Sequence, residues 1–239
     1  MLNYDEKKIE QSIQYEFQDK ALLKQAFSHS SFINEMRRKG MESYERLEFL
    51  GDAVLELITS EFLFEEYKDL TEGKLTKLRA SIVCEFTLSS VAAQLHFGEY
   101  VLWSKGEEQT GGRKRSSILC DLFEAVLGAI YLDGGMESAK KYVHTFLLTD
   151  IENKTLFYDA KTTLQESVQK DGKGVVTYKL IAEKGPDHNK SFVTEVFVDG
   201  VSLATGEGTS KKSAEQMAAY KAILKIKDGN GTEKVTGKK

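Results

Sequence analysis

Apolar side chains recur every three or four positions along most of the first 150 residues, the spacing that places them on one face of an α-helix. Glycines separate these periodic segments and no proline interrupts them. Residues 104–116 are polar, rich in glycine and basic at their end, so we expect an exposed loop there. The front of the chain is therefore predicted to be an all-helical domain, with helices over residues 7–17, 20–27, 44–67, 74–95, 117–132 and 136–148.

The pattern changes after Ile151. A short helix is predicted over residues 161–169, and apolar and polar residues then alternate, as in half-buried strands, over 175–182, 191–199 and 201–206. Asp199-Gly200 is a hairpin signal, and Ser210 can cap a last, alanine-rich helix from Lys211 to about Lys227. The order α-β-β-β-α predicts a small α+β domain over residues 159–229, followed by a disordered tail over 230–239.

The composition fits a globular protein of one large or two modest domains. Of 239 residues, 41% are hydrophobic and 29% charged, which excludes a disordered or fibrous chain. The longest apolar stretch, 118–132, is interrupted by Asp121 and Glu124, and the N-terminus has no apolar signal segment, so no membrane span is predicted. Cys84 and Cys120 are too few for a disulfide scaffold and lack metal-ligand spacing. We therefore expect a cytoplasmic protein in which both cysteines are core or incidental residues.

Charge divides unevenly between the two parts. Residues 1–158 hold 19 Lys and Arg against 26 Asp and Glu, whereas residues 159–239 hold 14 Lys against 11 Asp and Glu. A basic second part is the one more suited to contact a polyanion.

An acidic stripe marks the predicted helix at 44–67. Glu45, Glu48, Asp52 and Glu56 fall within an arc of roughly 80° when residues follow one another at 3.6 per turn. Like charges at this spacing repel one another and destabilise the helix unless a partner neutralises them. The stripe taken alone could also be a surface face that is paired with lysines or arginines from elsewhere.

A second acidic pair lies in the most apolar helix. Asp121 and Glu124 are the only charges in residues 117–130, and their spacing puts them on one face. Because a buried, unpaired carboxylate is costly, we expect this pair to face a cation or a wet cleft. Carboxylates without histidine or thiolate suit Mg²⁺ or Mn²⁺. Two such helices in one domain favour metal-assisted hydrolysis, with the substrate left open.

The run ERLEFLGDAVLEL, Glu45–Leu57, resembles the signature of bacterial ribonuclease III. Further features match that family in the same order: HSS at His29–Ser31, TEGKLTKLRA at Thr71–Ala80, SILCDLFEAVLGAIYLD from Ser117, and the C-terminal α-β-β-β-α unit. The resemblance extends over roughly residues 5–229. It implies a helical endonuclease domain at 5–134, with a trailing helix and linker to about 158, followed by a double-stranded-RNA-binding domain at 159–229.

The resemblance also implies an activity. Members of this family hydrolyse double-stranded RNA with Mg²⁺, which Mn²⁺ can replace, and use no organic cofactor. Their products carry 5′-phosphate and 3′-hydroxyl ends with short 3′ overhangs. The expected substrates are ribosomal-RNA precursors and other structured transcripts. Because cutting a duplex takes two scissions, a two-fold homodimer is expected to supply two sites.

Residue roles are implied only where this sequence matches the family pattern. Glu48, Asp121 and Glu124 match metal ligands, Asp52 and Glu124 match catalytic positions, and Glu45 and Glu72 match further acidic positions. Phe49 and Leu50 match the dimer interface, although the sequence alone favours Phe49 as an ordinary core aromatic. The positions that match RNA-binding residues are Lys161, Gln165, Glu166, His188, Lys211 and Lys212.

Two other functions remain open at this point. A regulator could keep the fold and bind double-stranded RNA without cutting it, but every matched acidic position is present. A Mg²⁺ phosphohydrolase of small molecules could use the same acids, but it would not need the RNA-binding unit. The loop at 104–116 could either contact RNA near the cut or serve as a linker.

Overall fold

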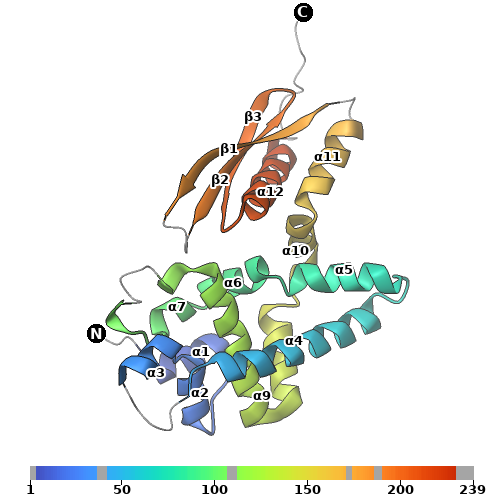
Figure 1. Cartoon of the computed structure of the whole chain (residues 1–239). Coiled ribbons are helices and arrows are strands. Elements are labelled where there is room, and N and C mark those ends of the chain that lie inside the picture. Colours follow the sequence, from blue (N-terminus) through green and yellow to red (C-terminus); the bar gives the residue numbers. More distant parts are fainter. Residues whose placement is uncertain (1–3, 37–41, 107–111, 171–173, 186–189, 230–239) are drawn as a thin grey trace, which may run out of the picture. The chain divides into compact units, whose positions relative to one another are not determined.

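The chain forms two compact units, Met1–Ile151 and Glu152–Lys239. The structure is a computed structural model that describes residues 4–36, 42–106, 112–170, 174–185 and 190–229 (Figure 1). Each unit has its own hydrophobic core. Across the described residues, no helix combines the length and apolar character needed to cross a membrane.

The first unit is helical, as predicted. The side chains of Asp5 and Asp19 cap the first two helices by accepting from the backbone N–H groups of Lys8 and Ala21. Only an isolated bridge between Ser28 and Leu102 adds β-structure among the described residues of this unit. Its helices are α1 (Glu6–Ile13), α2 (Lys20–Ala26), α3 (Ser30–Met36), α4 (Glu45–Glu66), α5 (Glu72–Ile82), α6 (Glu85–Gln94), α7 (Phe97–Tyr100) and α9 (Ser116–Phe146), with a 3-10 turn at Gly112–Lys114 (Figure 1).

One predicted helix is wrong. The segment 74–95 consists of α5 and α6, separated by Val83 and an extended Cys84. The Thr87 hydroxyl donates to the Ser81 carbonyl oxygen at 3.1 Å, so a side chain takes up an acceptor freed at the break. The apolar period runs through this corner because both helices bury residues in the same core, and the periodicity therefore does not show the break.

The helix at the centre of the core is α9. Between Leu122 and Ile130, every residue except Glu124 is buried. A backbone outlier at Gly135, with φ of 74°, bends α9 where the sequence predicts the separation of two helices. The apolar residues of α9 thus anchor the unit, and the carboxylate of Glu124 is held within an otherwise buried stretch.

Helices α4 and α9 approach one another backbone to backbone at two glycines. A Cβ atom added at Gly51 would lie 1.8 Å from the Glu124 carbonyl oxygen, and one added at Gly128 would lie 2.2 Å from that of Leu47. Both distances are far inside van der Waals contact, so only glycine permits this approach. The contact places the acidic stretch of α4 directly against the acidic stretch of α9.

The second unit is the predicted α-β-β-β-α domain, preceded by a helix that the sequence analysis does not predict, α10 (Ile151–Tyr158). Its three strands form an antiparallel sheet in the order β1-β2-β3, and Val198 pairs with both Val176 and Val201. Asp199 and Gly200 both have positive φ and make the tight hairpin. The elements are α11 (Ala160–Lys170), β1 (Val176–Lys184), β2 (Ser191–Val198), β3 (Val201–Gly208) and α12 (Lys211–Gly229) (Figure 1).

Small residues bring α12 close to the sheet. A Cβ atom at Gly206 would lie 2.2 Å from the backbone nitrogen of Ala218, and Ala214, Ala218 and Ala222 are fully buried. The alanine-rich pattern of the last helix therefore reflects tight packing of α12 on β3.

We predict that Gly51→Ala destabilises the first unit by about 2 kcal/mol or more, because the added methyl overlaps the Glu124 carbonyl group. The measurement is urea unfolding followed by the fluorescence of Trp103, the single tryptophan, which is buried in this unit.

The matched control is Gly73→Ala in the first turn of α5, where an added Cβ meets nothing within 4 Å. Removing a glycine from an open helical position should stabilise by about 0.5–1 kcal/mol. Equal effects of the two substitutions would contradict the proposed role of the close approach.

Candidate active site

Four carboxylates gather where α4 and α9 meet. Glu48 and Asp52 lie on either side of Gly51 on α4, and Asp121 and Glu124 lie on α9. Asp52 is exposed, whereas the other three are half-buried. The structure thus brings together the acidic residues that the sequence places on two separate helices.

The carboxylates of this group act on one another electrostatically. Burial, with the charges of Asp121, Glu45 and Asp52, raises the pKa of Glu48 to about 7. Burial, with the charges of Asp52 and Glu48, raises the pKa of Glu124 to about 8. Burial also raises the pKa of Asp121. Each carboxylate makes the ionisation of its neighbours harder, so the group favours a cation or protons.

The donor set fits a divalent cation. Among the described residues, no lysine or arginine forms an ion pair with Glu48, Asp121 or Glu124. Ligand atoms of Cys120, Asp121 and Glu124 lie within 4.8 Å of one another, a spacing at which they could hold a metal ion. Carboxylate oxygens are the ligands that Mg²⁺ and Mn²⁺ prefer.

Cys120, expected to be a core or incidental residue, is half-buried and packs against the core. Its sulfur atom also lies within 4.8 Å of a carboxylate oxygen of Asp121 and of one of Glu124, which the sequence analysis did not predict. The signal was present in the sequence, since residues 120 and 124 are one helical turn apart and share a face.

Sequence analysis also missed Tyr44. Its hydroxyl, from the residue just before α4, donates to Oδ2 of Asp121 at 3.4 Å. Burial and the charges of Asp121 and Glu48 raise the pKa of this phenol, so it remains a protonated donor. No period or spacing links two residues 77 positions apart.

The remaining predicted acids have different surroundings. Glu45 is exposed, and its charge acts on Glu48 and Asp121. Glu56 is held by Arg79, with 2.7 Å between Oε2 and Nε. Glu72 lies in the first turn of α5, where its Oε1 accepts from the Thr76 hydroxyl at 3.1 Å, and it lines a separate groove.

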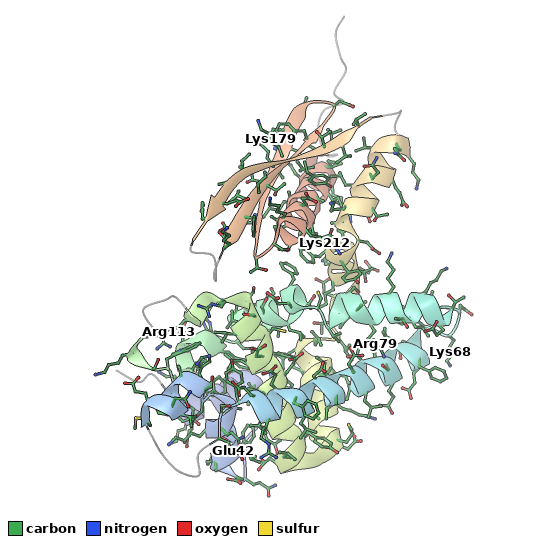
Figure 2. The ribbon with its side chains drawn as sticks, viewed as in Figure 1. Glu42, Lys68, Arg79, Arg113, Lys179 and Lys212 are labelled. Carbon is green, nitrogen blue, oxygen red and sulfur yellow. The ribbon has the colours of Figure 1, made fainter. Side chains whose placement is uncertain are left out.

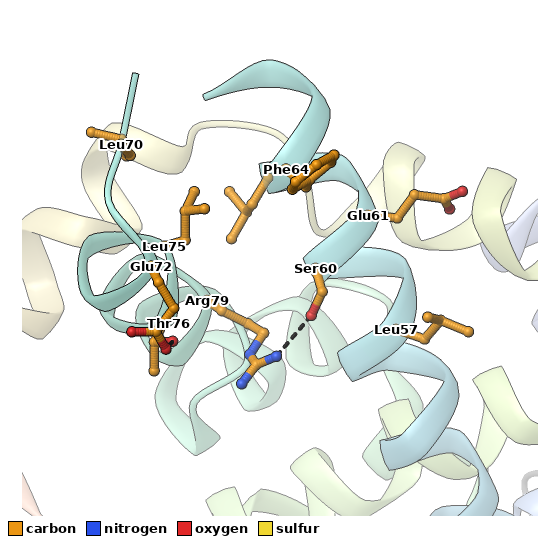
Figure 3. A pocket seen from close by; sticks show the side chains of 10 residues that line it. Leu57, Ser60, Glu61, Phe64, Leu70, Glu72, Leu75, Thr76 and Arg79 are labelled. Atoms are coloured by element: carbon orange, nitrogen blue, oxygen red, sulfur yellow. Dashed lines mark hydrogen bonds between the residues drawn. The ribbon is translucent and has the colours of Figure 1, made fainter. Parts of the chain in front are cut away.

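That groove lies between α4 and α5 and has a volume of about 640 Å³ (Figure 3). Arg79 crosses it and donates to the Ser60 hydroxyl at 2.8 Å. On α4, Leu57 is 57% exposed and Phe64 is 75% exposed. The apolar residues that line the groove are Leu57, Leu63, Phe64, Leu70 and Leu75.

Phe49 is also on α4 and is 80% exposed. The expectation from sequence alone, an ordinary core aromatic, is therefore wrong. Its neighbour Leu50 is half-buried and packs against the core. Large exposed apolar side chains on one helix indicate a surface that can be covered by a partner.

In the second unit, the predicted RNA-binding residues are on α11 and α12. Lys161 pairs with Glu215 and lies 4.8 Å from the centre of the Tyr178 ring, and Gln165 and Glu166 are exposed on α11. Exposed Lys211 and Lys212 open α12 (Figure 2). His188 lies outside the described residues.

The start of α12 has the features of an anion site. Ser210 and Ser213 cap it reciprocally, since each backbone N–H donates to the other side chain, at 3.0 and 3.1 Å. Nζ of Lys211 lies 3.4 Å from Oε1 of Glu183 and 5.9 Å from the centre of the Phe192 ring. Lysines beside the positive end of a helix dipole favour a bound phosphate.

Comparison with known proteins agrees with both units. The profile described as Ribonuclease-III-like matches residues 19–151, and the profile described as double-stranded RNA binding motif matches residues 160–226. A protein named Ribonuclease 3 from Bacillus licheniformis is 51% identical over 222 residues, which are 92% of this chain and 89% of that protein. One from Bacillus cereus is 49% identical over 224 residues, 93% of this chain and 91% of that protein.

A solved structure resembles the first unit. The nuclease domain of ribonuclease III from Campylobacter jejuni shares 44% sequence identity, with a TM-score of 0.55, and the match covers 59% of this chain and 95% of that one. That nuclease domain is described as having structural flexibility in a region involved in dimer formation.

We predict that, without divalent cations, the thermal stability of the first unit falls as the pH rises from about 5 to about 8. Burial raises the pKa values of Glu48 and Glu124 above the ordinary 4.5, so the folded state binds more protons than the unfolded state in this window. Glu124→Gln should therefore reduce the slope of Tm against pH, measured by Trp103 fluorescence.

Glu137→Gln, which changes an exposed carboxylate on α9, is the control and should keep the wild-type slope. Addition of Mn²⁺ should raise Tm most at the upper end of the window. If the slope of Tm against pH is the same in wild type and Glu124→Gln, ionisation of the acidic cluster does not cause the loss of stability at higher pH.

Proposed function

The chain belongs to the ribonuclease III family, and on that premise we propose that it is an endoribonuclease that cuts double-stranded RNA at the acidic cluster of α4 and α9. The observation that supports this site is the convergence of Glu48, Asp52, Asp121 and Glu124 without a cationic partner among the described residues. A group of this kind lowers its own electrostatic cost by binding a cation, and a bound divalent cation can promote phosphodiester hydrolysis.

In this proposal, Glu48, Asp121 and Glu124 hold Mg²⁺, which Mn²⁺ can replace. The bound cation supplies Lewis-acid chemistry for the attack of water and for the leaving 3′ oxygen. Asp52 is the exposed member of the group and lies close enough to Glu124 to raise its pKa. We propose that Asp52 and Glu124 orient the attacking water and accept its proton.

Glu45 is proposed to extend the acidic face, because its charge already acts on Glu48 and Asp121. Glu72 lies apart, on the groove between α4 and α5. We propose that it contributes to the cleavage surface of the assembled dimer.

The second unit is proposed to hold the duplex. Domains of this kind recognise A-form shape by contacting two minor grooves and the phosphates between them. Lys211 and Lys212 at the capped start of α12 are proposed to contact phosphates, and Lys161, Gln165 and Glu166 on α11 to contact the minor groove. His188, which lies between β1 and β2 in the sequence, is also proposed to contact RNA. The proposed domain limits are 5–134 for the nuclease and 159–229 for the RNA-binding domain.

A homodimer is proposed because a duplex has two antiparallel strands, and a two-fold axis relates two sites in the same way. Phe49, Leu57 and Phe64 expose large apolar surfaces on α4, which would be unfavourable in an isolated protomer. We propose that Phe49 and Leu50 lie at the interface. Departure of the 3′ oxygen at each cut would give 5′-phosphate and 3′-hydroxyl ends, and staggered cuts by two sites on opposite strands would give short 3′ overhangs. The proposed substrates are ribosomal-RNA precursors and other structured transcripts of the cytoplasm.

The experiment that tests this function uses an end-labelled RNA hairpin of about two helical turns, with Mg²⁺ or with Ca²⁺. Wild type should bind in both and make staggered cuts on both strands only with Mg²⁺. Glu124→Gln should bind the hairpin as tightly as wild type and reduce cleavage to background, because it removes a charged ligand and keeps the side-chain volume.

Glu137→Gln is the matched control on α9 and should cleave like wild type. The double substitution Lys211→Glu and Lys212→Glu should weaken binding and lower its salt dependence, because phosphate contacts release counterions. Binding without cleavage by wild type in Mg²⁺ or Mn²⁺ would support a non-catalytic regulator. Wild-type cleavage by Glu124→Gln would show that the site is wrong.

We predict that Phe49→Ser converts the protein from a dimer to a monomer of 26.9 kDa in sedimentation equilibrium. Leu132→Ser is the matched control, since Leu132 is an apolar residue of α9 that is also more than half exposed. A monomeric wild type, or a Phe49→Ser protein that remains a dimer, would contradict the proposed interface.

A further inference from the structure

Tyr44 occupies a fixed position between the two acidic helices. It is 4% exposed and lies immediately before α4. Its backbone nitrogen donates to the Ser28 carbonyl oxygen at 2.9 Å, and its own carbonyl oxygen accepts from the Glu48 nitrogen at 2.9 Å. The residue is therefore anchored on one side to the end of α2 and on the other to the first acidic turn of α4.

The ring of Tyr44 is held by residues of the HSS motif. The rings of His29 and Tyr44 are 5.8 Å apart, and the His29 ring lies 4.8 Å from that of Trp103. Nδ1 of His29 is 2.8 Å from the Ser31 hydroxyl oxygen. The buried Tyr44 side chain therefore has little freedom to point its hydroxyl away from Asp121.

From this position the hydroxyl reaches across to α9 and donates to Oδ2 of Asp121. At 3.4 Å the bond is long for O–H···O, so it favours one orientation of the carboxylate without fixing it rigidly. The phenol is a neutral donor, so it orients the Asp121 carboxylate without removing the negative charge that a cation binds.

A donor on one carboxylate oxygen leaves the other free to bind a cation. Without the donor, the Asp121 side chain would respond to the repulsion of the neighbouring carboxylates by rotating away from them. Hydrogen bonds to metal ligands commonly set the orientation of the ligand and strengthen binding in this way.

We propose that Tyr44 is a positioning residue that aligns Asp121 for divalent-cation binding. This inference rests on the proposed function, which makes Asp121 a ligand. It also gives a role to His29, whose ring lies against that of Tyr44, and to Ser31, whose hydroxyl oxygen lies 2.8 Å from Nδ1 of His29. The short motif and the acidic helices then form one functional unit.

The test compares Tyr44→Phe with Tyr142→Phe. Both changes remove one phenol oxygen and keep the ring, and the Tyr142 hydroxyl is buried without a hydrogen-bond partner among the described residues. Binding of Mn²⁺ to the full-length protein, without RNA, is measured from the loss of the free-ion signal in electron paramagnetic resonance. We expect about tenfold weaker binding for Tyr44→Phe and wild-type binding for Tyr142→Phe.

Cleavage of the RNA hairpin gives a second readout. The Mg²⁺ concentration for half-maximal rate should rise for Tyr44→Phe, and the rate should recover as Mg²⁺ is increased. Unfolding followed by Trp103 fluorescence checks that each variant is folded under the conditions used. A stability loss with unchanged Mn²⁺ affinity would show a purely structural role and overturn the proposal.

Asp121→Asn distinguishes the role of Tyr44 from the assignment of Asp121 as a cation ligand. If it loses Mn²⁺ binding while Tyr44→Phe binds like wild type, the cation site is correct and the role of Tyr44 is wrong. If both bind Mn²⁺ like wild type, Asp121 is not a ligand, and the inference fails together with the assignment on which it rests. Weakened binding in both variants supports the positioning role.

Discussion

The close approach of α4 and α9 at Gly51 and Gly128 is the constraint on which the first unit depends. Because a Cβ atom at either position would overlap a backbone carbonyl oxygen, the distance between the helices is set by main chain and not by side chains. Carboxylates carried one turn away from this contact on either helix must then face one another. The same contact that completes the core therefore creates the electrostatic strain of the site.

That strain is tolerated because apolar burial around it is extensive. Along α9, residues 122–130 are buried except for Glu124, so the helix cannot move outward to relieve the repulsion without exposing core side chains. The raised pKa values of Glu48 and Glu124 express the remaining cost. A site held in this way is preorganised for a cation before the cation arrives, at some expense in stability. Recognition of the duplex can be assigned to a separate unit, whose α12 packs on its own sheet through alanines and glycines.

Local periods predict the helical and α+β units, the acidic stripe of α4 and the acidic pair of α9. The resemblance to the family, and not the spacing, singles out Glu48 and Asp52 within the stripe. Residues 48 and 52, like 121 and 124, share a helix face, and that is readable from spacing alone. Sequence reasoning failed where three-dimensional contacts decide. The break at Cys84 is hidden because α5 and α6 both contribute to one core. Phe49 is an aromatic residue of the kind usually found in a core, but it is exposed. Tyr44 contacts Asp121 although the two residues are 77 positions apart in the sequence.

The acidic residues alone do not explain the site. The carboxylates of the cluster repel one another, and without other contacts their side chains would rotate apart. This repulsion is strongest in the absence of a cation, when the geometry has to be set. Uncharged donors solve this problem because they orient a carboxylate without neutralising the group. Tyr44, supported by His29 and anchored to Ser28, is such a donor on Asp121. The HSS motif then has a physical reason to accompany the acidic helices in one chain: it fixes the position of a neutral group that the carboxylates require.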